Sequence, residues 1–119
     1  MKVFTQLVAS TLATLVTTSQ IAFAQNALPA QVEAIRRARA ATYGAMAACE
    51  YVNGRMDVAQ SYDALEAALR KNGVQDQERW LQTDNGGAAI AMVMSYMRKD
   101  CSLEGDEMEM SGALMPLLN

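Results

Sequence analysis

The sequence predicts a small all-α protein, a helical bundle with three main helices running up, down and up, one short connector helix, and one disulfide. Three observations predict this fold class. Apolar residues recur at spacings of three and four along the chain, which is the period of an α-helix. Asn-Gly and Gly-Gly pairs divide the chain into helix-sized segments. Cys49 and Cys101 are the two cysteines of the chain, and a bond between them requires the ends of the first and last main helices to meet.

The first 24 residues predict a signal peptide. Residues 3–21 are mostly apolar, and Ala22-Phe23-Ala24 places small residues at positions −3 and −1 of a cleavage site. We therefore expect cleavage between Ala24 and Gln25. The alternative is an uncleaved anchor helix, because the apolar stretch approaches bilayer length. Its many Thr and Ser residues favour cleavage, after which no stable membrane insertion is expected.

Export predicts an oxidising compartment: the periplasm, the thylakoid lumen or the extracellular space. Two cysteines in such a compartment predict a disulfide, Cys49–Cys101. Closing a loop of about 53 residues would stabilise the fold by roughly 4 kcal/mol in the chain-entropy model. A redox or metal-binding thiol pair is the alternative. The predicted organisation is a signal peptide at 1–24, a helical domain at 25–101, and an acidic and apolar flexible tail at 102–119.

The first predicted helix begins near residues 26–29 and ends at Asn53-Gly54, a strong turn signal. Small residues dominate from 38 to 48, so another helix can approach closely there. Arg36, Arg37 and Arg39 predict a solvated basic face, with an anion site as the alternative. The stripe expected to face the core consists of Leu28, Val32, Ile35, Ala38, Thr42, Met46 and Cys49.

The second predicted helix has clear signals at both ends. Asp57 and Gln60 form a capping-box pattern at its start. Asn72-Gly73 ends it, and Val74 is placed to contact Leu69 as in a Schellman motif. Its apolar stripe consists of Val58, Tyr62, Leu65 and Leu69.

The third segment, residues 77–82, predicts the short connector helix, with Trp80 as a core residue or, alternatively, an exposed binding anchor. Residues 83–87 contain Gly86-Gly87, which is expected to interrupt the helical pattern because glycine is a poor helix former. Residues 88–100 predict the last main helix, followed directly by Cys101. The apolar end of the tail, residues 113–118, is expected to dock on the bundle or on a partner.

The composition excludes several function classes. The chain contains no histidine and carries 13 acidic against 10 basic residues, a net charge of −3. A nucleic-acid partner is not expected, because phosphate neutralisation needs Lys and Arg. Serines lack a histidine to activate them. The sequence therefore predicts neither an enzyme nor a bound cofactor.

The methionines raise one alternative, a Cu(I) site, because thioethers are soft ligands. Met108 and Met110 lie in the tail and are the weak candidate pair. Met92, Met94 and Met97 share one predicted helix, and Met92 points away from Met97. These three are expected to fill gaps in the core. No metal site is otherwise predicted.

The pattern Cys49-x-Tyr51-x-x-Gly54, followed by a helix and the distant Cys101, resembles small exported two-cysteine helical proteins of bacteria. Among these are uncharacterised cyanobacterial proteins, periplasmic chaperones of the HdeA type and secretion-system immunity proteins. The resemblance implies an all-α fold around one disulfide and a binding or holdase role. We expect an exported helical protein that acts by contact with an unknown protein partner. The alternatives are an acid-responsive periplasmic holdase and a Met-based Cu(I)-binding protein.

Overall fold

The structure, a computed structural model, describes the backbone of residues 13–119 and the side chains of residues 29–119. The chain divides into two compact units, residues 1–33 and 34–119. The predicted signal peptide lies partly outside the described residues, and the predicted cleavage point Ala24–Gln25 falls in a helical stretch whose side chains are not described. The second unit contains the rest of α1 and all the other helices.

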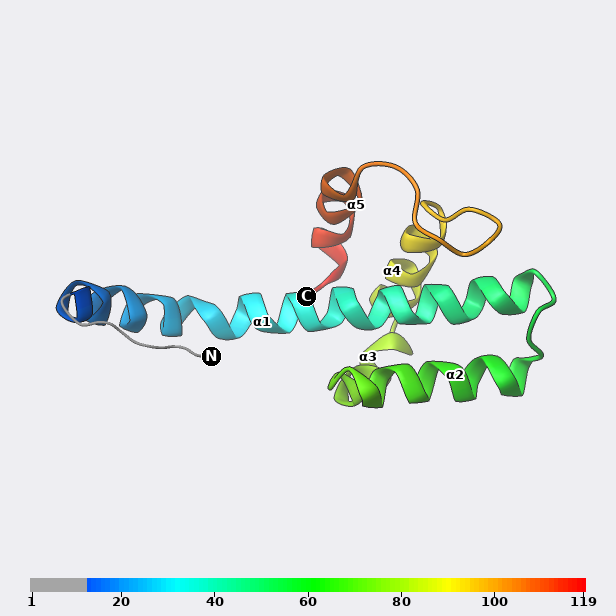
Figure 1. Ribbon diagram of the computed structural model, residues 1–119, viewed down its shortest axis with the longest axis horizontal. Coiled ribbons are helices and arrows are strands. Elements are labelled where there is room, and N and C mark those ends of the chain that lie inside the picture. Colours follow the sequence, from blue (N-terminus) through cyan, green and yellow to red (C-terminus); the bar gives the residue numbers. More distant parts are fainter. Residues whose placement is uncertain (1–12) are drawn as a thin grey trace. The chain divides into compact units, whose positions relative to one another are not determined.

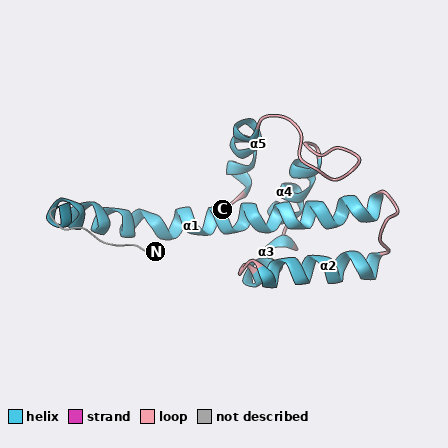
Figure 2. Ribbon diagram, in the orientation of Figure 1, coloured by secondary structure: helices cyan, strands magenta, loops and turns pink. Residues whose placement is uncertain are grey.

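The predicted fold class is confirmed: the described residues form a small all-α fold joined by the Cys49–Cys101 disulfide. Figure 2 shows helices joined by loops, the longest lying between α4 and α5. Within the second unit, Figure 1 shows α2 running back beside α1, α4 rising obliquely, and α5 on the side of α1 away from α2. The elements are α1 (Ala13–Val52), α2 (Val58–Lys71), η1 (Gln75–Gln77), α3 (Glu78–Leu81), α4 (Asp84–Met94), α5 (Glu107–Leu114) and η2 (Met115–Leu117).

Helix α1 differs from its prediction in both its start and its buried face. It does not begin near residues 26–29, since it starts at Ala13 and Pro29 lies inside it. Ile35 and Met46, predicted to face the core, are 56% and 44% exposed. The buried face is instead made of alanines, because small side chains let the other helices approach α1 closely. Its fully buried members are Ala40, Ala41 and Ala45.

Helix α2 matches its prediction at both ends. Asp57 accepts from the backbone N–H of Gln60 at 2.8 Å, and the Gln60 side chain accepts from the backbone N–H of Asp57 at 2.9 Å. At the other end Gly73 has a φ of +72°, and the N–H of Val74 donates to Leu69 O at 2.9 Å. Both Val74 and Leu69 are buried. The capping box and the Schellman motif are confirmed.

Helix α4 starts and ends earlier than predicted. Gly86-Gly87 does not interrupt the helix, because Thr83 caps it by accepting from the N–H of Gly86 at 3.1 Å. Gly86 packs directly on the preceding segment, where only a glycine fits. At its end α4 stops at Met94, and the chain then folds back through a bridge between Met97 and Leu103. Cys101 therefore lies in a loop.

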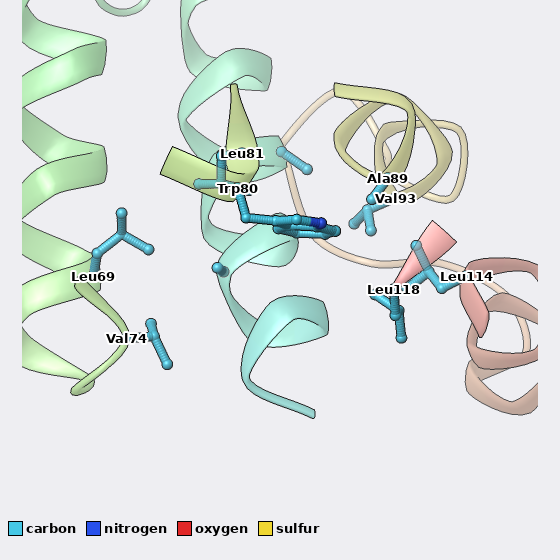
Figure 3. Close-up of a cluster of buried hydrophobic side chains, with 11 residues drawn as sticks. Leu69, Val74, Trp80, Leu81, Ala89, Val93, Leu114 and Leu118 are labelled. Carbon is cyan, nitrogen blue, oxygen red and sulfur yellow. The ribbon is translucent and has the colours of Figure 1, made fainter. Parts of the chain in front are cut away.

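The core is centred on Trp80, which confirms its predicted place inside the fold. Figure 3 shows its ring directed toward Val93 and Leu118. The guanidinium of Arg37 lies 5.3 Å from the ring centroid, which is cation–π distance. The apolar end of the tail, residues 113–118, was predicted to dock either on the bundle or on a partner. It docks on the bundle, since Leu114 and Leu118 are buried in the core cluster.

Candidate functional site

The candidate site is a groove of about 350 Å³ between α1 and α2. Alanines line both helices of the groove, while larger apolar side chains and polar groups complete the lining. The small side chains of Ala47 on α1 and of Ala64 and Ala68 on α2 leave room between the larger lining residues for part of a further helix. The lining residues are Tyr43, Met46, Ala47 and Glu50 on α1, Met56 in the turn, and Ala64, Ala68, Lys71 and Asn72 at α2.

The two sides of the groove are held in register by polar contacts. Ser61 of α2 donates to the backbone oxygen of Ala47 on α1 at 3.2 Å. At the turn Arg55 forms an ion pair with Glu50, and Gly54 supplies the positive φ of +76° that the turn requires. Because these contacts fix α1 and α2 relative to each other, they also fix the shape of the groove.

The other end of the groove lies beside a second anchor between α1 and the end of α2. Arg36 donates to both carboxylate oxygens of Asp76 and, at 2.8 Å, to Gly73 O. The hydrogen bond from Arg36, followed by its positive charge, lowers the pKa of Asp76 below the usual range. Ionised Asp76 therefore ties α1 to the chain just after α2.

A hydrogen bond between Tyr62 and Glu78 connects α2 to α3. The Tyr62 hydroxyl donates to the carboxylate, and this bond, together with the negative charge of Glu78, raises the pKa of Tyr62 to about 12. Tyr62 is 47% exposed, so the bond is a surface brace and leaves the phenol protonated at neutral pH.

The disulfide is surrounded by two polar side chains from the α1–α2 turn. Asn53 Nδ2 donates to Lys99 O at 3.0 Å, and Arg55 Nη2 donates to the same oxygen at 3.1 Å. Arg55 Nη2 also lies 2.9 Å from Cys101 Sγ. Both half-cystines are buried. The bond and its neighbours fasten the loop after α4 to the end of α1, which is a structural role.

The structure does not bring Met108 and Met110 together. They are two positions apart on α5, so they point to nearly opposite sides of the helix. Met108 is 82% exposed, whereas Met110 packs against the core. Met92, Met94 and Met97 also pack against the core. Among the described residues, no group of three or more His, Cys, Asp or Glu side chains could hold a metal ion.

Several serines and acidic residues near the C-terminal end of the chain have local roles in the structure. Ser95 donates to Met92 O at 2.6 Å, and Ser102 donates to Asp100 at 2.6 Å. Asp106, from the acidic run, caps α5 by accepting from the N–H of Met108. In the described part of the chain these groups serve helix ends and turns.

Sequence reasoning missed the groove. Ala64 and Ala68 are four residues apart and share one face of α2, and this pair was the available signal. The larger side chains of α2 alone predicted its buried face. The exposed groove face of α1 was likewise assigned to the core.

Searches of protein-family models, of curated proteins and of solved structures find no match to this chain. In the part of the chain that the structure describes, no helix combines the length and apolar character needed to span a bilayer.

Proposed function

We propose that this is an exported binding protein that receives a helix of another protein in the α1–α2 groove. The observation that carries the proposal is the open groove, lined in part by alanines, between two helices that are fixed to each other. Amphipathic helices bind in such grooves through residues spaced three and four apart. Methionines suit the walls of these sites because their side chains adapt to varied surfaces.

The charges of the groove specify the partner helix further. Lys71 lies at one end and makes no ion pair or side-chain hydrogen bond within the described residues. Glu50, near the other end, is already paired with Arg55. An acidic side chain on the partner would therefore be favoured at the Lys71 end. The expected partner is a helix with a small and apolar stripe and a carboxylate near one end.

Export is part of the same proposal. It is supported by the small residues of Ala22-Phe23-Ala24 and by the disulfide, which is typical of oxidising compartments. Cleavage after Ala24 would leave Pro29 close to the start of α1. Proline is well tolerated in the first turn of a helix, whereas it is unfavourable in a helix interior.

Filling the groove should strongly weaken partner binding. Ala64→Leu places a larger side chain in the groove, and we expect it to weaken capture of the partner at least about tenfold, or 1.4 kcal/mol. Ala59→Leu makes the same change at an exposed position of α2 that does not line the groove. Wild-type protein and both variants serve as baits for the exported fraction, with mass spectrometry of the captured proteins.

The expected result is a reproducible partner captured by the wild type and by Ala59→Leu and lost with Ala64→Leu. Circular dichroism checks that both variants remain helical. If the three baits capture the same proteins, or none captures any reproducibly, the groove is not the binding site and the proposal is wrong.

A second candidate function, an acid-responsive holdase, is favoured by the Arg36–Asp76 anchor. The folded-state pKa of Asp76 is lowered, so its contribution to stability is fully present above the ordinary pKa of 3.8. It is lost as the pH falls through the lower folded-state value. The apolar side chains of Leu69 and Val74 lie buried at this junction. Acid would weaken the anchor that keeps them covered.

Asp76→Asn tests this candidate. We expect the variant to be less stable than wild type at pH 7 and to approach wild-type stability near pH 2, because protonated Asp76 no longer pairs with Arg36. Urea unfolding across this pH range measures the difference. The holdase function requires that the wild type also suppress light scattering by an aggregation-prone client in acid. Equal client aggregation with and without the protein at every pH would eliminate this candidate.

A further inference from the structure

A second exposed apolar surface, here called the α5 face, lies where α5 meets α1. It contains a hollow of about 200 Å³ that shares no lining residue with the α1–α2 groove. Figure 1 shows α5 and the C-terminus beside α1, and Arg37 fixes them there by donating to Leu118 O at 2.9 Å. The hollow is lined mainly by Ala34, Ile35 and Ala38 of α1 and by Leu114, Met115 and Leu118.

Two exposed methionines, Met108 in α5 and Met115 at the start of η2, lie on one face with the small residues Ser111 and Gly112 between them. Met108, Ser111, Gly112 and Met115 follow the spacing of one helix face. Met108 is 82% exposed and Met115 is 67% exposed. Two large apolar side chains in water on one face of a short helix are unfavourable, and each would be stabilised by burial. The face therefore has the composition of an interaction surface.

Gly112 supports this interpretation independently. Glycine weakens a helix relative to alanine, so its place inside α5 needs a reason. A Cβ at Gly112 would meet no atom within 4 Å, which means that the packing of the described chain does not require glycine. Its missing side chain leaves room for close approach of another backbone.

The charges at the two ends of the α5 face are opposite. Glu107 and Glu109 lie in the first turn of α5 and are exposed. At the other end, Arg39 follows Ala38 of the hollow and shares the side of α1 that carries Ile35. Within the described residues these three charged side chains make no ion pair and no side-chain hydrogen bond. All three charges are available to an outside partner.

We propose that the α5 face binds a second copy of this chain about a two-fold axis passing near Gly112. In a two-fold dimer, if residue i of one copy contacts residue j of the other, then residue j of the first copy contacts residue i of the second. Antiparallel crossing of two α5 helices at Gly112 brings Met108 of each copy over Met115 and the hollow of the other. The same operation brings the first turn of α5, with Glu107 and Glu109 on the two flanks of Met108, toward the Arg39 end of the other copy.

A second copy fits this surface better than an unrelated partner because the surface is complementary to itself. Its acidic end and its basic end are exchanged by the two-fold axis, so every contact is made twice. Met108 supplies the unbranched apolar side chain that the hollow can take, and Gly112 supplies the close approach. Surface charge pairs are weakened by salt, so the dimer should dissociate more readily at high ionic strength.

Sedimentation equilibrium of the full chain tests the proposal. The wild type is expected to show the mass of two chains at low salt and a larger fraction of single chains in 1 M NaCl. Arg39→Glu should shift the equilibrium toward single chains by at least tenfold, and Glu107→Arg/Glu109→Arg should do the same. Mixing these two variants one to one should restore the dimer, because each supplies the charge that the other has lost.

Asp63→Arg is the matched control, since it reverses an exposed acidic residue on α2 that lies outside the α5 face. It should leave the dimer unchanged. Gly112→Ala should raise the melting temperature of the single chain while weakening association, a combination that a folding defect would not produce. The proposal is overturned if the wild type sediments as single chains, or if association is unaffected by the Arg39 and Glu107/Glu109 reversals, or if the mixture does not restore it.

Discussion

Replacing both half-cystines, as Cys49→Ser/Cys101→Ser, is expected to destabilise the protein by about 2–4 kcal/mol. The two residues are separated by 52 positions, and the bond removes the freedom of this long loop from the unfolded chain. The loss would lower the melting temperature by roughly 10–25 °C for a domain of this size. Thermal unfolding followed by circular dichroism measures the change.

The structure shows why the native fold depends on this bond. The loop after α4 contributes Cys101 and Leu103, but Leu103 is partly exposed. Beyond the disulfide, the loop is held to α1 and its turn mainly by Asn53 and Arg55, which both donate to Lys99 O. Hydrogen bonds of this kind contribute only about 1 kcal/mol each. Without the bond, we expect the loop to detach before α1 and α2 separate.

Reduction provides the control for this prediction. Wild-type protein treated with a thiol reductant should unfold at the temperature of the double variant, and the double variant should not respond to the reductant. Intact mass of the exported protein before reduction reports both the bond and whether the chain begins at Gln25. An oxidised wild type no more stable than the double variant would contradict the prediction.

The parts of the fold that the sequence predicted correctly depend on local signals. The ends of α2 are determined by Asp57, Gln60 and Gly73, and each acts within a few residues of its own position. Capping geometry needs no tertiary information. The cysteine pair was also predictable, because the chain has two cysteines and only one pairing exists.

The parts that the sequence did not predict depend on tertiary packing. Hydrophobicity placed Ile35 and Met46 inside, but close packing of helices selected the smaller face with Ala41 and Ala45. A Cβ at Gly44 would come within 2.8 Å of the Ile90 side chain, so this face admits little more bulk. The candidate groove was missed for the same reason, since its alanines are informative only when two helices are known to lie side by side.

The start of α4 is the place where helix propensity and tertiary packing disagree most. Substitutions of the adjacent glycines, Gly86 and Gly87, test which of the two decides. Gly86→Ala is expected to destabilise the fold by about 2–3 kcal/mol, the upper part of the range for overpacking. A Cβ at Gly86 would lie 2.1 Å from Trp80 O and 2.6 Å from Leu81 Cα. These are backbone atoms, so relief requires α3 and α4 to move apart. Trp80 and Leu81 are both in the core that would be disturbed.

Gly87→Ala, the neighbouring substitution, should have the opposite sign. A Cβ at Gly87 would meet no atom within 4 Å, so the change removes a poor helix former and stabilises α4 by up to about 1 kcal/mol. Helix propensity alone would predict stabilisation from both substitutions. Urea unfolding of the two variants beside wild type measures the difference. If Gly86→Ala stabilises the protein as much as Gly87→Ala, then the close contact of α4 with the Trp80–Leu81 backbone does not determine where this helix begins.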